Sequence, residues 1–157
     1  MKSARCLNVY LFSCLTIAAL LLTSACKKDK EQKVSSSLMG GWNETGLSAN
    51  VSRSLRFYGD SVALNIAASG VVYSLTKISG TYKVQGNNLV FNFDKQFVME
   101  SGRQSALTPY TGKLYENATF SVDGNTLTLK YTTYPADAPV VTTAKFTRGL
   151  IGYQSIK

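Results

Sequence analysis

Hydrophobic and polar residues alternate along most of the chain after residue 38, and the hydrophobic ones recur at a spacing of two. Leu55 and Phe57 form one such group, and Val62, Leu64 and Ile66 form the next. Successive side chains of a β-strand point to opposite faces, so this spacing predicts strands with one buried face. The later groups that share a face are Val71, Tyr73 and Leu75; Tyr82 and Val84; Leu89, Phe91 and Phe93; Phe120 and Val122; Leu127, Leu129 and Tyr131; and Val140, Ala144 and Phe146.

Short turn-forming segments separate the predicted strands. They are Tyr58-Gly59-Asp60, Ser69-Gly70, Gln85-Gly86-Asn87-Asn88 and Asp123-Gly124-Asn125. Connections this short join antiparallel neighbours, because parallel strands need a long crossover. With a first strand at Gly41 to Thr45, we expect eight to nine strands. Nowhere do apolar residues follow a helical spacing for long, so we expect at most a turn or two of helix, at Ser35 to Gly40.

This pattern predicts an all-β fold: an antiparallel up-and-down β-barrel of about eight strands over residues 38–157. Closure into a barrel removes the exposed strand edges that an open meander would leave. An open sandwich is the alternative. The longest irregular stretch, Asp94 to Gly112, is either a lid over the barrel mouth or conceals a strand around Gln96 to Glu100.

The first 26 residues have the pattern of an export signal. Lys2 and Arg5 precede a long uncharged run whose most apolar part is Leu15 to Leu22. The run is long enough to span a bilayer, so an uncleaved signal anchor is one alternative. However, the small residues Thr23, Ser24 and Ala25 then lead directly to Cys26, where the hydrophobic run stops. This ending resembles the lipobox of bacterial lipoproteins, including the relaxed boxes of Bacteroidetes. An ordinary cleaved signal is the other alternative to a lipoprotein signal.

The resemblance implies a signal peptide at 1–25, acylation of Cys26, and a short tether at 26–37 before the barrel. The tether mixes Lys, Asp and Glu and then has three serines, and no apolar period runs through it. Such a charged run is similar to the surface-export signals of Bacteroidetes lipoproteins, although a plain solvated spacer has the same composition. Lys27 stands where an inner-membrane lipoprotein often has Asp. We therefore expect an exported outer-membrane lipoprotein, with the cell surface as a further expectation.

Composition narrows the chemistry. The chain has 157 residues, three cysteines, no histidine and a formal net charge of +8. The cysteines are Cys6, Cys14 and Cys26, so the barrel contains none and cannot form a disulfide. Its 11 Lys and Arg are spread along residues 38–157 without a cluster. We therefore expect no nucleic-acid partner.

No catalytic constellation is visible. Without histidine, the commonest general base and metal ligand are missing. The acids of the barrel segment are isolated in sequence; they are Glu44, Asp60, Asp94, Glu100, Glu116, Asp123 and Asp137. We therefore predict no catalytic residues, no metal, no cofactor and no enzymatic activity; acids that converge only in the fold are the route by which this prediction could fail.

Several short segments resemble the bacterial lipocalin-like domain. They are Gly40-Gly41-Trp42, Leu55-Arg56-Phe57, Gly80-Thr81-Tyr82-Lys83-Val84, Val122-Asp123-Gly124-Asn125-Thr126-Leu127-Thr128-Leu129 and Lys145-Phe146-Thr147-Arg148. The resemblance spans nearly all of 38–157 and implies an eight-stranded barrel with one closed end and one mouth. It also implies that Trp42 lies across the closed end with Arg148 packed over its indole, as a structural pair. An unrelated partner for Trp42 is the alternative.

The aromatic residues with inward parity are the candidate ligand contacts: Tyr73, Tyr82, Phe91, Phe93 and Tyr131. A barrel of eight strands either fills its interior with side chains or keeps a pocket for one small ligand. Our leading hypothesis is a lipid-anchored, non-catalytic lipocalin-like lipoprotein that binds a small apolar or amphipathic molecule. The alternative is a structural or assembly lipoprotein with a filled barrel, acting through protein contacts with a partner that the sequence does not identify.

Overall fold

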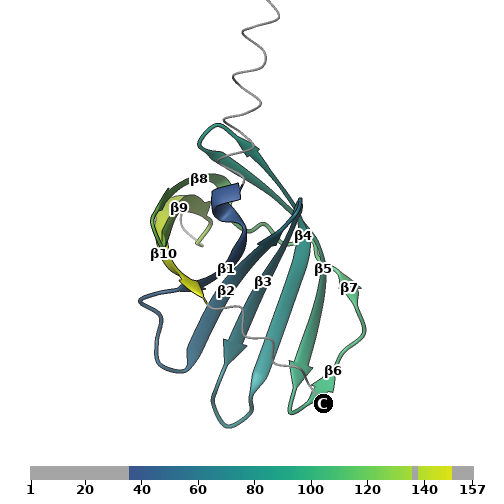
Figure 1. Cartoon of the computed structure of the whole chain (residues 1–157). Coiled ribbons are helices and arrows are strands. Elements are labelled where there is room, and N and C mark those ends of the chain that lie inside the picture. The colour runs from purple at the N-terminus through teal and green to yellow at the C-terminus, as the bar shows by residue number, and fades with distance from the viewer. Residues whose placement is uncertain (1–35, 136–137, 150–157) are drawn as a thin grey trace, which may run out of the picture. The chain divides into compact units, whose positions relative to one another are not determined.

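One antiparallel sheet of ten strands coils round on itself in the computed structural model, which describes residues 36–135 and 138–149 (Figure 1). The predicted signal peptide, Cys26 and most of the tether lie outside the described residues. The strands are β1 (Gly40–Glu44), β2 (Val51–Tyr58), β3 (Ser61–Ala68), β4 (Ser74–Gln85), β5 (Asn88–Glu100), β6 (Arg103–Gln104), β7 (Thr108–Pro109), β8 (Glu116–Asp123), β9 (Thr126–Thr133) and β10 (Val140–Gly149). Residues 36–38 form a turn of helix. Within the described ranges, no helix combines the length and the apolar character that crossing a membrane requires.

Eight of the strands close into a barrel. Each pairs with its neighbours in the order β4-β3-β2-β1-β10-β9-β8-β5, and β5 pairs again with β4. This confirms the predicted antiparallel barrel of about eight strands. The two-residue strands β6 and β7 are additions to the edge of β5.

The barrel has two different ends. The tight turns β2–β3, β4–β5 and β8–β9 lie at one end, together with the helical turn that leads into β1; we call this the closed end. The connections β1–β2, β3–β4 and β9–β10 lie at the other end, which we call the mouth; of these three, the β3–β4 connection is the lowest in Figure 1.

The core fills the closed half of the barrel. Leu38, Trp42, Leu55, Phe57 and Phe146 are fully buried there. Strand register explains this packing, because directly opposed residues share a face: Trp42 stands opposite Leu55 on one side and Arg148 on the other. Within the described residues, all strand pairings and all members of the core lie between residues 38 and 149. The barrel is therefore complete without the residues that precede it.

Arg148 closes this end. Its guanidinium carbon lies 4.3 Å from the centre of the Trp42 ring. The same guanidinium donates hydrogen bonds of 2.8 Å to the carbonyl oxygens of Met39 and Ser37, while the Trp42 indole donates one of 2.7 Å to the carbonyl of Leu38. The Arg148 side chain of the last strand thus contacts the Trp42 indole and also binds backbone carbonyls at the helical turn.

The seam between β5 and β8 is the least regular part of the barrel wall. The two strands share a single register pair, Asn88 with Thr119, supported by a hydrogen bond from the Phe120 amide to the Asn87 carbonyl. Beyond that point β5 pairs with β6 and β7 instead, and the Tyr110 amide binds the carbonyl of Asp94. Residues 103–110 therefore cover the edge of β5.

Three details of the sequence prediction were wrong. The two predicted strands at Val71–Leu75 and Tyr82–Val84 are one strand, β4, which begins only at Ser74. Val71 to Tyr73 instead belong to the β3–β4 connection, because Ala68 pairs directly with Ser74. Val140 is exposed at the start of β10 and does not join the buried face of Ala144 and Phe146.

The interpretation of Asp94 to Gly112 as one irregular stretch was also wrong. Asp94 to Glu100 continue β5. This agrees with the alternative expectation of a strand concealed around Gln96 to Glu100. A bulge explains why the pattern hid them: pairing with β4 shifts at Ser79 and Gly80, where Gly80 opposes Phe93 and Ser79 opposes Lys95. The inward parity of β5 therefore changes after Phe93.

We predict that Arg148→Ala lowers the free energy of unfolding by about 1–2 kcal/mol, because it removes a cation–π contact and two hydrogen bonds. Urea unfolding followed by Trp42 fluorescence measures this loss. Lys145→Ala, an exposed cation on the same strand, is the matched control and should change the value by less than about 0.5 kcal/mol. Equal losses in both variants would contradict the assignment.

Candidate functional site

A cavity of about 450 Å³ opens at the mouth of the barrel. Its wall combines aliphatic and aromatic side chains with a few polar groups from four parts of the chain. They are Arg53 of β2; Leu64 and Ile66 of β3; Tyr131, Thr132 and Thr133 of β9, with Tyr134 after it; and Lys113, Leu114 and Tyr115 before β8. We call this the mouth cavity. The mouth cavity borders the packed core. Leu64 and Tyr131 belong to the core and also line the cavity.

An ion pair lies beside this cavity. Arg53 and Glu44 stand on adjacent strands, with their nitrogen and oxygen atoms 3.0 Å apart. Both are on the inward face, because Glu44 shares parity with Trp42 and Arg53 shares parity with Leu55. The Glu44 side chain is only 8% exposed and the Arg53 side chain 30% exposed. The guanidinium is thus the partner that remains accessible from the cavity.

Burial controls the charge state of this pair. Loss of solvent raises the pKa of the Glu44 carboxyl above its usual value, and the attraction of Arg53 offsets only part of that rise. Burial also acts to lower the pKa of Arg53, but its surroundings, which include the charge and the hydrogen bond of Glu44, outweigh burial and raise that pKa. Arg53 therefore stays a cation at every pH of interest.

Tyr115 forms part of the cavity wall with an unusual backbone. Its φ is +54°, a left-handed conformation that is uncommon for a residue other than glycine. The residue is 5% exposed, and its hydroxyl oxygen has no hydrogen-bond partner among the described residues. Burial is the main cause that raises the pKa of this phenol, so it remains a neutral donor. Its ring packs edge-on against Tyr131, with the ring centres 4.7 Å apart.

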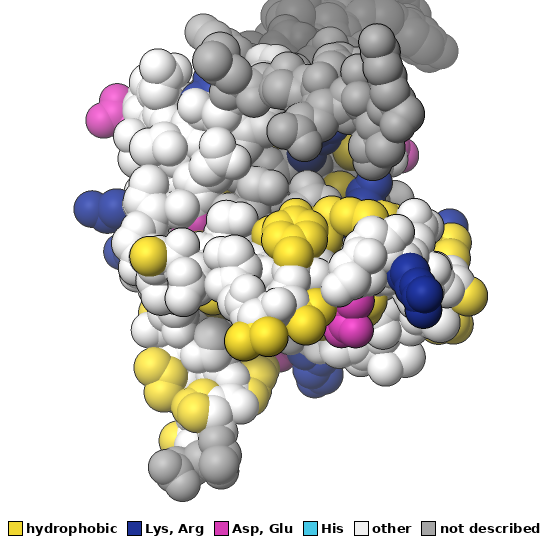
Figure 2. All heavy atoms as spheres, turned by 90° about the horizontal axis from the view of Figure 1, so that it is seen from below, with side chains coloured by type: hydrophobic (Ala, Val, Ile, Leu, Met, Phe, Trp, Pro, Cys, Tyr) yellow, Lys and Arg dark blue, Asp and Glu magenta, His cyan; other side chains and the backbone are white. Residues whose placement is uncertain are grey.

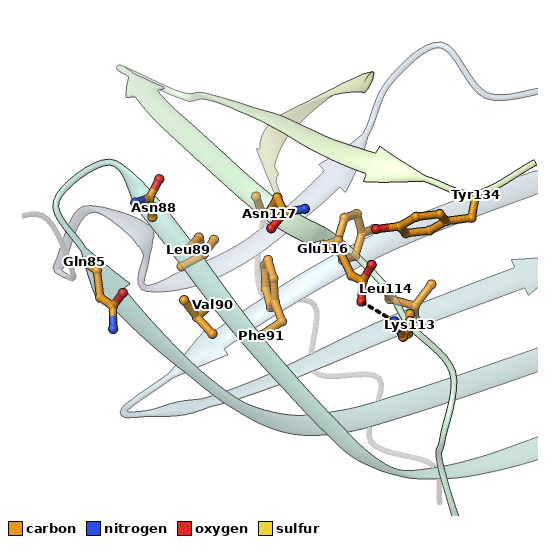
Figure 3. A pocket seen from close by; sticks show the side chains of 12 residues that line it. Gln85, Asn88, Leu89, Val90, Phe91, Lys113, Leu114, Glu116, Asn117 and Tyr134 are labelled. Atoms are coloured by element: carbon orange, nitrogen blue, oxygen red, sulfur yellow. Dashed lines mark ion pairs between the residues drawn. The ribbon is translucent and has the colours of Figure 1, made fainter. Parts of the chain in front are cut away.

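A second hollow of about 620 Å³ follows the seam between β5 and β8 (Figure 3). Figure 3 shows Phe91 of β5 facing Glu116, with the ion pair of Lys113 and Glu116 beside it. The Lys113 and Glu116 charges are 3.2 Å apart. Four residues line both hollows: Lys113, Leu114, Tyr115 and Tyr134. The segment 113–115 therefore separates the mouth cavity from the seam.

The structure places the five predicted ligand contacts differently from one another. Tyr131 lines the mouth cavity and Phe91 lines the seam hollow. Phe93 is half-buried and stacks on Phe91, with ring centres 5.5 Å apart. Tyr82 is buried and its hydroxyl donates a 2.9 Å hydrogen bond to the Gly59 carbonyl, so its polar group already has a structural partner.

Tyr73 is the prediction that the structure contradicts. Its side chain is 48% exposed in the β3–β4 connection, so it does not line the barrel interior. The connection repeats the spacing of a strand, but it makes no ladder that would turn alternate side chains inward. The backbone carbonyl of Tyr73 instead accepts a hydrogen bond from the Ser101 amide.

Of the residues that line the mouth cavity, the sequence interpretation named only Tyr131 as a candidate ligand contact, and among the polar groups at the cavity it missed Glu44, Arg53 and Tyr115. The first two carried a usable signal, because each occupies an inward-parity position next to Trp42 or Leu55, where a charge is unexpected. Tyr115 carried none. Its position depends on the irregular path of the segment before β8, which no spacing in the sequence reveals.

The described residues contain no group of three or more Asp, Glu, His or Cys side chains that could hold a metal ion. Comparison of the chain with protein-family models, curated proteins and solved structures found no match. The interpretation of the site therefore depends on the geometry of this chain.

We predict that the difference in stability between Glu44→Gln and the wild type depends on pH. A raised pKa in the folded state means that the native carboxyl binds its proton more tightly than the unfolded one, so wild-type stability falls as pH rises from about 4.5 through the raised value. Glutamine does not titrate. The free energy of unfolding of Glu44→Gln relative to wild type should therefore rise with pH across this window, measured by urea unfolding at several pH values. A difference that stays flat or falls would contradict the burial of Glu44.

Proposed function

We propose that this protein is a membrane-anchored lipocalin-like lipoprotein that binds a small apolar or amphipathic molecule in the mouth cavity, without catalysis. The mouth cavity carries this proposal. Its volume of about 450 Å³ lies within the range of small-molecule sites, and such sites combine an apolar wall with a few placed polar groups.

The polar groups of the cavity favour a ligand with a hydrogen-bond acceptor at one end. The buried hydroxyl of Tyr115 donates no hydrogen bond within the described residues, because its neighbour Arg53 is itself only a donor, and an unused buried donor of this kind costs free energy until an acceptor arrives. The guanidinium of Arg53 supplies further donors beside it. Ile66, Leu64 and Leu114 supply apolar wall for the rest of the molecule. An amphipathic molecule fits both the polar donors and the apolar wall of the mouth cavity.

A specific observation favours the alternative of a filled barrel. Aromatic rings form a continuous chain through the interior, from Tyr82 to Phe57 to Phe91 to Tyr115 to Tyr131, with neighbouring centres 4.7–6.2 Å apart. In that case the interior provides stability alone and the outer surface contacts a protein partner. The two proposals differ in whether a probe enters beside Ile66.

We expect the chain to bind dansyl-undecanoic acid, an amphipathic fluorescent probe, at one saturable site. Ile66→Trp should weaken binding by roughly tenfold or more, because the larger side chain occupies the apolar part of the mouth cavity. Fluorescence titration measures the affinity. Thr143→Trp, at an exposed outward position of β10, is the control and should leave it unchanged.

Absence of saturable binding to the wild type would favour the filled barrel. The same would follow if the two tryptophan variants bound the probe as tightly as each other, because binding would then not involve the mouth cavity. Thermal unfolding of both variants checks that each still folds.

The proposed anchor has its own test. We expect radiolabelled palmitate to enter the full chain in its host and to be absent from Cys26→Ala, because Cys26 is the expected acyl acceptor. Gel fluorography after metabolic labelling measures this. Equal labelling of both chains would rule out Cys26 as the anchor, and it would leave the test of the mouth cavity unaffected.

A further inference from the structure

Exposed hydrophobic side chains gather at the mouth. Of the ten large hydrophobic side chains that are exposed in the described residues, six lie in or directly beside two connections, β3–β4 and β9–β10. They are Val71, Val72, Tyr73, Tyr134, Val140 and Val141. We call these six residues the rim patch. Val71 is fully exposed and Val141 is 74% exposed, so both side chains project into solvent.

The rim patch has two separate parts. In the barrel, β3 and β4 are separated from β9 and β10 by β2 and β1 on one side and by β8 and β5 on the other. The two connections therefore stand across the mouth from each other. Figure 2, seen from the mouth end, shows hydrophobic side chains in separate groups on this face, with several Lys and Arg side chains toward its edge.

Hydrogen bonds hold both parts in place. The Ser101 amide donates to the Tyr73 carbonyl at 3.1 Å, which ties the β3–β4 connection to the turn after β5. The Thr133 hydroxyl donates to the Val140 carbonyl at 3.2 Å and is 2.9 Å from the Thr142 hydroxyl. These bonds hold Tyr73 and Val140, which are next to the exposed Val72 and Val141.

This arrangement fits a lipid surface better than a protein. A stable protein interface needs a continuous, shape-complementary patch with a buried centre, whereas these two groups flank an opening. A fluid bilayer adapts to two separate projections, and valine and tyrosine are side chains that enter its interfacial region. Insertion of apolar side chains needs no anionic headgroup, so a zwitterionic bilayer is sufficient for docking of this kind.

We propose that the rim patch docks the barrel, mouth first, on the surface of a zwitterionic lipid bilayer. Val71 and Val141 insert into the interfacial region, and Tyr73 lies at the level of the headgroups. Docking of this kind makes the mouth cavity continuous with the membrane interface. The inference does not depend on a ligand in the cavity or on acylation of Cys26, because it follows from the exposed residues alone.

A single-cysteine label tests this placement. A chain of residues 36–157 contains the whole barrel and no cysteine, so Val71→Cys carries a unique thiol for the fluorophore bimane. With phosphatidylcholine vesicles that contain doxyl-labelled lipid, the bimane of Val71→Cys should be quenched roughly threefold more than a label at Asn87→Cys, an exposed control at the closed end. Equal quenching at both positions, or none at either, would overturn the proposal.

Apolar insertion is tested by a matched pair of variants. The double variant Val71→Asp/Val141→Asp should reduce the fraction that floats with phosphatidylcholine vesicles by roughly tenfold, because it replaces two inserting side chains with charges. Val90→Asp changes an exposed valine on the outer wall and should float like the wild type. Equal loss in both would overturn the proposal. So would a wild-type dimer in sedimentation velocity that the double variant abolishes, because a second copy would then cover the rim patch.

Discussion

The contact of Arg148 with Trp42 is the interaction on which the rest of the barrel depends. Trp42 is in the first strand and Arg148 is near the end of the last, and they are directly opposed in the ladder that joins these two strands. The guanidinium also binds the carbonyls of Met39 and Ser37, which fixes the helical turn under the closed end. Because this end is packed, the two hollows of the barrel interior open at the mouth and along the seam between β5 and β8.

This division gives the two halves different tasks. The closed half contains the fully buried Trp42, Leu55 and Phe146 and provides stability. The mouth half contains features that cost stability: a carboxylate buried beside Arg53, a buried phenol without a partner at Tyr115, and a left-handed backbone at that same residue. Such features concentrate at sites of function more often than in cores. The proposed ligand site lies where the barrel is least optimised for stability.

Much of the fold was predictable because hydrophobic alternation and glycine turns are local signals that the barrel does not override. The prediction was wrong where the residue spacing along the chain does not match the strand pairing of the barrel. Val71 to Tyr73 alternate like a strand but form a connection, and the bulge opposite Gly80 shifts the parity of β5 and hid Asp94 to Glu100. The candidate site was harder to predict. Arg53 and Glu44 were visible as charges at inward positions, whereas Tyr115 enters the site through an irregular segment with no period.

The account centres on a mouth cavity that holds a small molecule. The most direct measurement is mass spectrometry of small molecules extracted from the full chain after purification from the envelope of its own host, beside Ile66→Trp and a mock purification. The account predicts one reproducible compound at near-stoichiometric amount in the wild type, absent from the mock and strongly depleted in Ile66→Trp. A wild-type extract identical to the mock, or one that Ile66→Trp leaves unchanged, would contradict it.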